Sequence, residues 1–352
     1  MGDVLLVGMG ITAATALQSL ADKCRVVGLV RKANPDNPNG AADDAVIAAA
    51  RAYGIPVFDD TSLAGLRHLV ERLRPACVVI SSFDRIIPAD LLGRCRFVNV
   101  HYAPLPQYRG RANVNWAIIN GESHTAITIH LVDPGLDSGN VLYQESIPIE
   151  RSDTVADLYD RLNELQLQHL GESVARFLDG DTGVPQSSEL ATYGCTRLPG
   201  DGEIDWTAPT HKIDALVRAL VKPFPGAFTY FNGRRLVVWR AEAVEQPPVY
   251  VGRVPGRVVN VSRADGHIDV LTGDGVLRIF EVELDEGPVP AAHLIRTVRA
   301  TLGLRSSDLL LRIEALEREI ERLRERTLSL ESGLSPSEHA AFACEEPCVK
   351  IR

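Results

Sequence analysis

The sequence has 352 residues, of which 37 are basic and 46 acidic, so its formal net charge at pH 7 is −9. A chain of this length usually folds as more than one domain, and its 45% apolar and 24% charged residues are typical of a globular protein. An acidic balance repels a polyanion unless positive charge is concentrated on one face, which argues against nucleic acid as the first choice of partner. The first residues contain neither a long apolar run nor a basic leader, so we expect a cytoplasmic protein that does not contact a membrane.

The six cysteines are too few for a disulfide scaffold and lack the C-x-x-C spacing of a zinc site. We therefore expect no metal site and interpret most of the cysteines as small buried apolar residues. Cys344 and Cys348 stand close together in a polar tail, where they form either an incidental pair of exposed thiols or a redox pair.

Short apolar runs alternate with amphipathic helical patterns in the first part of the chain. The runs lie at residues 4–8, 25–30, 56–58, 77–81 and 97–100, and the helical patterns near 17–21, 46–53 and 66–73. This alternation predicts an α/β fold with a Rossmann-like parallel sheet covered on both faces. Two further β-patterned runs, 125–131 and 142–149, should extend the same sheet, and a long helix should follow over 155–178.

The opening V-G-M-G resembles the start of a dinucleotide-binding turn, because a pyrophosphate meets a helix N-terminus at such a place. Ala13 stands where the third glycine of G-x-G-x-x-G belongs, and Arg31 and Lys32 follow the second strand where an acidic residue would bind the ribose. We therefore favour a tight strand-to-helix turn. A dinucleotide-binding oxidoreductase or a non-catalytic binding module stays a remote alternative.

The composition divides the chain into five parts. We expect a catalytic domain over 1–185, a linker rich in Gly, Pro, Ser and Thr over 186–202, a small β-rich (OB-like) domain over 203–303, a helix over 304–330 and a disordered tail over 331–352. The β-rich domain should contain helices at 211–221 and 291–302 and strands at 227–231, 235–243, 256–261, 267–271 and 276–284.

The terminal helix carries apolar residues at alternating spacings of four and three, the pattern of a coiled coil. The seam consists of Leu309, Ile313, Leu316, Ile320 and Leu323. Because it covers only about two to three heptads, docking on its own chain and formation of a homodimer carry nearly equal weight.

Asn99 and His101 stand at the end of a predicted strand, where open parallel sheets bind their ligands, and strand alternation places both on one face. An amide such as Asn99 can donate to a developing oxyanion, a histidine such as His101 can accept a proton near neutral pH, and a carboxylate such as Asp137 can hold the imidazole. Amine formylation requires these three functions. His101 and Asp137 also have structural interpretations when each is taken alone: His101 as a hydrogen-bonded histidine at a strand end, and Asp137 as a turn former. The prediction of catalysis therefore depends on the combination of the three residues.

The segment N-V-H-Y-A-P-L-P-Q-Y-R-G and the downstream D-P-G-L-D-S-G resemble the signature of the 10-formyltetrahydrofolate-dependent formyltransferases, N-x-H-x-S-x-L-P-x-x-R-G followed by G-L-D-T-G. The resemblance extends from residue 1 to about 300, through D-G-E-I-D-W and P-F-P-G-A-F-T-Y-F. It implies that Asn99, His101 and Asp137 are catalytic and that 10-formyltetrahydrofolate is the co-substrate. Ala103 stands at the position of the family's usual serine, so no hydroxyl contact is implied there.

The same resemblance implies where the folate and the acceptor amine bind. The folate pocket should be lined by the loop S-S-F-D-R-I-I-P and by the loop before Asp137, through Arg85, Ile86, Ile87, Asp133 and Gly135. The acceptor should lie near Tyr102, Arg109, Arg111, Asn113, Asn115 and Trp116, although Trp116 can equally be a core residue at a helix start.

Two branches of the family differ in their acceptor, one acting on methionyl-tRNA and the other on nucleotide-linked amino sugars. A tRNA enzyme needs a basic surface, but residues 203–300 contain 12 basic and 12 acidic residues, and the segment after the second strand has two bases against three acids. The segments R-G-R-A-N-V-N-W and P-F-P-G-A-F resemble the sugar branch. We therefore expect a nucleotide-linked amino sugar as the small-molecule acceptor, with methionyl-tRNA, or an amino acid or hydroxylamine siderophore precursor, as alternatives.

Overall fold

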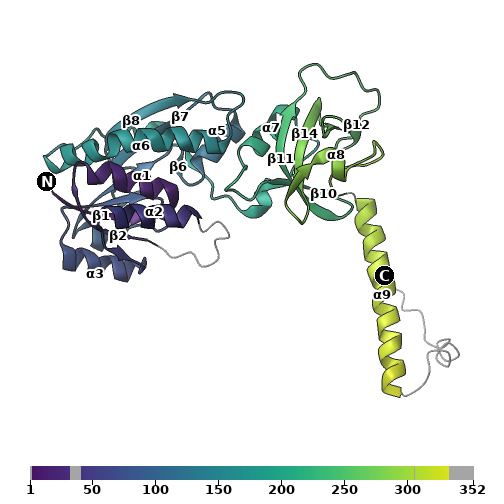
Figure 1. Cartoon of the computed structure of the whole chain (residues 1–352), viewed down its shortest axis with the longest axis horizontal. Coiled ribbons are helices and arrows are strands. Elements are labelled where there is room, and N and C mark those ends of the chain that lie inside the picture. The colour runs from purple at the N-terminus through teal and green to yellow at the C-terminus, as the bar shows by residue number, and fades with distance from the viewer. Residues whose placement is uncertain (1, 32–40, 305, 333–352) are drawn as a thin grey trace.

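The computed structural model describes residues 2–31, 41–304 and 306–332. Cys344, Cys348 and the predicted tail from residue 333 onward lie outside the described residues. Figure 1 shows an N-terminal α/β half, a C-terminal β-rich half beside it, and a final helix that extends away from the β-rich half. Within the described residues, no helix is both long and apolar enough to cross a lipid bilayer.

The N-terminal half is built on a seven-stranded sheet with the strand order β3-β2-β1-β4-β5-β7-β8. The first five strands in this order are parallel, and β7 and β8 continue the sheet antiparallel beyond β5. The predicted Rossmann-like sheet and its two-strand extension are confirmed. The strands are β1 (Asp3–Gly8), β2 (Arg25–Val30), β3 (Val57–Phe58), β4 (Cys77–Ser81), β5 (Arg96–His101), β7 (His124–Leu131) and β8 (Val141–Pro148).

The central strands are buried on both faces, because helices cover each side of the sheet. In β1, Val4 and Leu6 belong to the apolar core formed with α1, α2 and α6, whereas Leu5 and Val7 belong to the core formed with α3 and α4. Side chains that alternate between two apolar layers explain why these strands are continuous apolar runs. The helices are α1 (Gly10–Ala21), α2 (Ala41–Ala52), α3 (Leu63–Leu73), α4 (Ala89–Leu92), α5 (Asn113–Asn120) and α6 (Val155–Leu178).

The glycine at the end of β1 is required by close packing of the sheet. A Cβ atom on Gly8 would lie 2.0 Å from the backbone oxygen of Ser81 in β4. No side chain larger than hydrogen fits there without moving the neighbouring strand. Close packing of the sheet therefore explains Gly8 of the V-G-M-G segment without a bound dinucleotide.

The C-terminal half contains a six-stranded antiparallel sheet with the order β10-β11-β14-β13-β12, to which β15 adds beside β14. The predicted β-rich domain is confirmed. Its strands are β10 (Ala227–Phe231), β11 (Arg234–Ala243), β12 (Val258–Ser262), β13 (His267–Leu271), β14 (Val276–Glu283) and β15 (Pro288–Pro290), and its helices are α7 (Thr210–Arg218) and α8 (Ala291–Leu294). The final helix is α9 (Ser306–Ser332).

The predicted helix over 291–302 is wrong beyond Leu294, where α8 ends. The chain instead runs beside the start of β12, where Val258 N donates to Ala300 O at 3.1 Å and Leu302 N donates to Gly256 O at 2.8 Å. These tertiary hydrogen bonds replace the helical ones, which explains why the local helical pattern did not decide the structure.

Candidate active site

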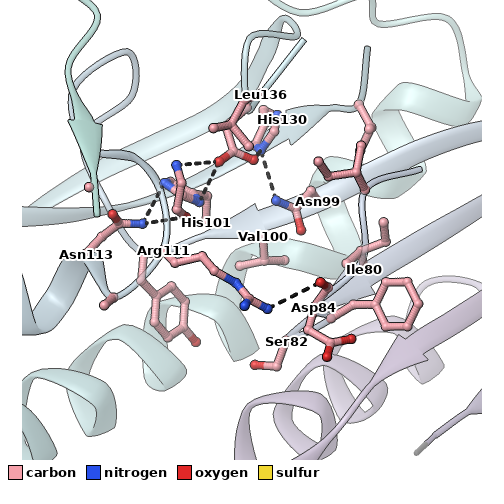
Figure 2. A pocket seen from close by; sticks show the side chains of 18 of the residues that line it. Ile80, Ser82, Asp84, Asn99, Val100, His101, Arg111, Asn113, His130 and Leu136 are labelled. Carbon is pink, nitrogen blue, oxygen red and sulfur yellow. Dashed lines mark hydrogen bonds and ion pairs between the residues drawn. The ribbon is translucent and has the colours of Figure 1, made fainter. Parts of the chain in front are cut away.

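A cavity of about 560 Å³ opens at the carboxyl ends of β4 and β5, within the size range of small-molecule sites. The loop after β4, the loop after β7 and the start of α5 form most of its wall. Figure 2 shows Asn99, His101 and His130 on one side of this cavity and Asp84 and Ser82 on the other, with Arg111 reaching between them. The crevice is where an open parallel sheet is expected to bind a ligand.

Asn99 is held by a buried histidine on the neighbouring strand. Antiparallel pairing of β5 with β7 places Asn99 opposite His130, and Asn99 Nδ2 lies 3.1 Å from His130 Nε2. His130 Nδ1 donates to the backbone oxygen of Leu131 at 2.8 Å, so Nε2 is the unprotonated nitrogen and accepts from Asn99. This leaves Asn99 one amide N–H that is not used in these bonds.

His130 is 1% exposed, and burial together with the neighbouring His101 lowers its pKa below the ordinary histidine range. A neutral ring suits its role as an acceptor for Asn99. The sequence interpretation missed this residue. The sequence indicates this residue only through its place near the end of the run T-A-I-T-I-H-L. To predict that it lies beside Asn99, the register between the two strands must also be known.

His101 is also buried, and its two ring nitrogens face two acceptors. Nε2 lies 2.9 Å from the backbone oxygen of Tyr108, which can only accept, and 3.1 Å from Asn113 Nδ2, which can only donate, and we assign a proton to Nε2 on the basis of the shorter contact. Nδ1 lies 3.7 Å from Asp137 Oδ2. Asn113 packs its amide nitrogen 3.1 Å from the same Nε2 and donates to Gly110 O at 3.1 Å. The ring is thus fixed in orientation, and Nδ1 is the nitrogen able to take up a proton.

Asp137 approaches both histidines. Its Oδ1 lies 3.7 Å from His130 Nε2, and its Oδ2 accepts from Gly110 N at 2.8 Å. The distances to the rings exceed a hydrogen bond, as is common for catalytic groups without bound substrate. The backbone φ of Asp137 is +48°, a left-handed conformation that is unusual outside glycine and stores strain in the loop.

The loop that carries Asp137 is tied down by a glutamine from the predicted linker. Gln186 Nε2 donates to Asp137 O at 2.9 Å and to Gly139 O at 2.7 Å, and Gln186 Oε1 accepts from Arg109 Nη2 at 2.8 Å. A Cβ on Gly139 would lie 2.0 Å from Leu131 O, so this close turn requires glycine. Arg109 is 5% exposed and lies outside the cavity lining, where it supports the loop through Gln186.

The predicted linker forms part of the cavity wall. Its strand β9 (Tyr193–Gly194) pairs with β6 (Arg109–Gly110), and Gly194 and Thr196 line the cavity. The indole Nε1 of Trp116 donates to the linker oxygen of Cys195 at 2.8 Å. Trp116 is half-buried and does not line the cavity. The sequence interpretation missed this role of the linker, since turn-forming residues give no signal for long-range docking.

All five residues predicted to bind the folate lie at the cavity: Arg85, Ile86, Ile87, Asp133 and Gly135. Ile86 is 77% exposed, whereas Ile87 is buried beneath the loop after β4. Asp133 Oδ1 accepts from Gly135 N at 3.0 Å and from Ser138 Oγ at 2.6 Å, so this carboxylate shapes its own loop. Ile86 and Ile87 therefore give this side of the cavity apolar side chains, which suit the flat face of a heterocycle.

Two residues predicted near the acceptor occupy different parts of the cavity. Arg111 is exposed and donates through Nη2 to Asp84 O at 3.3 Å, across the cavity in Figure 2. Tyr102 lies in the floor with its hydroxyl turned into the protein, where it donates to Asn163 Oδ1 at 2.8 Å. Burial raises the pKa of Tyr102, and the hydroxyl is not directed at the cavity.

Within the described residues, no group of three or more His, Cys, Asp or Glu side chains is arranged to hold a metal ion.

A Rossmann-like sheet that presents an Asn and a His from a strand end, and an Asp from a neighbouring loop, to one cavity is typical of an α/β group-transfer enzyme. Two protein-family models match the chain: Formyl transferase over residues 13–174, and Formyl transferase, C-terminal domain, over residues 199–299. The chain belongs to the formyl transferase family and is a formyl-transfer enzyme. The family's formyl donor is 10-formyltetrahydrofolate, so the predicted co-substrate is confirmed.

Known relatives resemble the chain over most of its length. Methionyl-tRNA formyltransferase of Alkaliphilus oremlandii is 31% identical over 290 residues, which cover 80% of this chain and 91% of the relative. Methionyl-tRNA formyltransferase of Caldanaerobacter subterraneus is 37% identical over 218 residues, which cover 61% of this chain and 68% of the relative.

Solved structures share the fold at lower identity. An N-formyltransferase from Helicobacter canadensis, solved with folinic acid and dTDP-3-aminofucose, superposes with a TM-score of 0.59 at 17% identity, covering 79% of this chain and 98% of that one. HypX from Aquifex aeolicus, solved with tetrahydrofolic acid, gives a TM-score of 0.59 at 17% identity over 83% of this chain. This chain spans 46% of the length of HypX, and at this identity both likenesses show the fold alone.

The expectation of a nucleotide-linked amino sugar as acceptor is wrong. The relatives at 31 and 37% identity are methionyl-tRNA formyltransferases, whereas the sugar enzyme resembles the chain only in fold. The net negative charge was a poor guide to the acceptor because it does not show where positive charge is concentrated on the surface. Several side chains of the segment that suggested a sugar site already make hydrogen bonds within the protein. Arg109 donates to Gln186, Asn115 donates to Ala219 O, and Trp116 donates to Cys195 O.

Proposed function

We propose that this enzyme transfers the formyl group of 10-formyltetrahydrofolate to the amino group of methionyl-tRNA. The observation that carries the proposal is the similarity to methionyl-tRNA formyltransferase over 80% of this chain and 91% of the relative, since it includes both halves of the molecule. We retain the division into domains at 1–185 and 203–303 as part of the proposal. A tRNA acceptor also supports a cytoplasmic location.

We assign the chemistry to Asn99 and His101 at the end of β5 and to Asp137 in the loop after β7. The acceptor nitrogen attacks the formyl carbon, and the carbonyl π electrons move onto the formyl oxygen, which accepts a hydrogen bond from the unused N–H of Asn99. His101 takes the proton of the attacking nitrogen at Nδ1, and Asp137 stabilises the resulting imidazolium. When the bond between the formyl carbon and N10 of the folate breaks, N10 takes that proton, so the site returns to its starting state.

The surrounding residues fit a folate on one side and an acceptor on the other. We assign the folate to the side formed by Arg85, Ile86, Ile87, Asp133 and Gly135. Arg111 is exposed at the cavity, and its guanidinium group provides local positive charge for the terminal phosphates of a tRNA. Tyr102 and Asn113 then form the floor beneath the acceptor, and Arg109 and Trp116 act by holding the cavity wall.

The test is tetrahydrofolate release from 10-formyltetrahydrofolate in the presence of methionyl-tRNA, with uncharged tRNA and free methionine as separate acceptors. We expect release with methionyl-tRNA, and formyl label that co-precipitates with the tRNA. Asn99→Ala should abolish most of the release, whereas Asn120→Ala, at an exposed asparagine at the end of α5, should not. Release that is absent with methionyl-tRNA, or equally fast with free methionine, would refute the proposed acceptor.

A further inference from the structure

Helix α9 (Ser306–Ser332) is 27 residues long and extends from the β-rich half without packing on it, as Figure 1 shows. Of its described side chains, all are exposed except that of Glu319, which is intermediate. The formyl transferase family match ends at residue 299, before this helix begins. A single exposed helix gains little from its own hydrogen bonds, so most helices of this kind are stabilised by a partner.

An apolar seam runs along α9 in the described structure. Its residues are Leu309, Ile313, Leu316, Ile320 and Leu323, which are 45 to 50% exposed. The alternating spacing of four and three places them on one stripe of the helix. The exposure excludes the alternative that this seam docks on the described part of its own chain.

The order of residue types along the seam specifies a kind of partner. Isoleucine occupies the first apolar position of each heptad, at Ile313 and Ile320, and leucine the second, at Leu309, Leu316 and Leu323. A β-branched residue at the first position with leucine at the second favours two parallel strands, because their knobs enter the facing holes at different angles.

The charges beside the seam fit a second copy of the same helix. In a parallel, in-register pair, Arg312 of one copy faces Glu317 of the other, and Glu319 faces Arg324. Each contact occurs twice by symmetry, and each joins opposite charges. A self-complementary surface of this kind is what a two-fold interface requires.

We propose that α9 is a dimerisation helix that pairs with α9 of a second copy of this chain in a parallel two-stranded coiled coil. Because α9 follows the β-rich half directly, this arrangement places the β-rich halves of both copies at the same end of the coiled coil. The dimer carries two separate active sites, and the proposal does not depend on which amine they formylate.

The test is the mass of the full-length chain in solution, measured by sedimentation across a dilution series. We expect a mass twice that of one chain, which falls to that of one chain when Ile320→Glu places a charge in the seam. The matched control is Leu311→Glu, since Leu311 is an exposed leucine on the opposite stripe of the same helix, and it should leave the mass doubled. A wild-type chain that stays a monomer at every concentration, or Leu311→Glu dissociating as readily as Ile320→Glu, would overturn the proposal.

Two further variants test the partner and its direction. Glu319→Arg should weaken the dimer because it faces Arg324, and the double variant Glu319→Arg/Arg324→Glu should restore it. Leu309→Cys should form a disulfide-linked dimer under mild oxidation, since parallel in-register pairing brings the two copies of this position together, and the wild-type chain is the background control. A dimer that does not cross-link through Leu309→Cys would exclude the parallel arrangement, and a dimer indifferent to the charge reversals would exclude the proposed register.

Discussion

Replacing Gln186 with alanine should lower the turnover number while leaving the fold intact. Gln186 donates to Asp137 O at 2.9 Å and to Gly139 O at 2.7 Å, so it is the side chain that joins the predicted linker to the catalytic loop. Asp137 has φ +48°, a left-handed conformation from which we expect it to relax when the restraint is removed. The carboxylate would then spend less time beside His101.

The size of the effect follows from the bonds removed. Two neutral hydrogen bonds are worth about 1 kcal/mol each, and the bond that Gln186 accepts from Arg109 at 2.8 Å involves a charged donor. Nε of Arg109 has no hydrogen-bond partner among the described residues, so this buried guanidinium loses much of its remaining support. If about 2 to 3 kcal/mol of this restraint is needed in the transition state, turnover falls roughly 30- to 150-fold.

The assay is steady-state tetrahydrofolate release, with the thermal midpoint measured in parallel. We expect a lower kcat with little change in the KM for the folate. Gln186→Glu should be as impaired as Gln186→Ala, since a carboxylate still accepts from Arg109 but repels the two carbonyl oxygens. Gln168→Ala, at an exposed glutamine on α6, is the matched control. A wild-type kcat in Gln186→Ala would refute the idea that the linker holds the catalytic loop.

Three further predictions concern the active site and its support. Asn99→Ala should lower kcat by about 10²- to 10³-fold with the folate KM nearly unchanged, because an oxyanion donor acts mainly in the transition state, and an unchanged kcat in tetrahydrofolate release would remove Asn99 from that role. The lowered pKa of His130 means that the unfolded chain binds a proton below about pH 6.5 that the folded chain refuses, so the free energy of unfolding should fall as the pH drops below this value. Urea unfolding at several pH values should show a smaller fall in His130→Gln, and an identical pH dependence would contradict this assignment. Asn115→Ala removes the bond from Nδ2 to Ala219 O at 2.6 Å and should destabilise the protein by about 1 to 3 kcal/mol in the same measurement, whereas no loss would show that this contact between the two halves is dispensable.

The fold could be predicted from the sequence where burial dictates the pattern. The runs at 4–8 and 77–81 are largely apolar at consecutive positions because both faces of β1 and β4 are covered, and their short length between helical patterns favours strands. The segment 295–302 was mispredicted because its apolar residues suit a helix locally but are bound to β12 in the tertiary structure. Local patterns carry no information about a hydrogen-bond partner such as Gly256, which lies 46 residues before Leu302 in the sequence.

Some residues of the site could also be predicted from the local pattern, whereas others depend on the tertiary structure. Asn99 and His101 are two positions apart on one strand, so strand alternation alone predicts that they share a face. Asp137 and His130 join them only through the register of β5 against β7 and the turn after β7. The role of Gln186 could not be predicted, since it holds the catalytic loop through backbone oxygens, and backbone atoms have no signature in the sequence.

The acceptor could not be predicted from the proposed catalytic residues, because the roles that we propose for Asn99, His101 and Asp137 would serve the attack of any primary amine. Recognition has to come from the walls of the cavity, and the segment from Arg109 to Trp116 connects these walls. Its β6 residues pair with the linker, and Asn115 binds the β-rich half through Ala219 O. The same segment contacts His101 through Asn113 and the Asp137 carboxylate through Gly110 N. We therefore expect substitutions within this segment to change kcat and the acceptor KM together in steady-state tetrahydrofolate release, and a change in the acceptor KM alone would contradict this expectation.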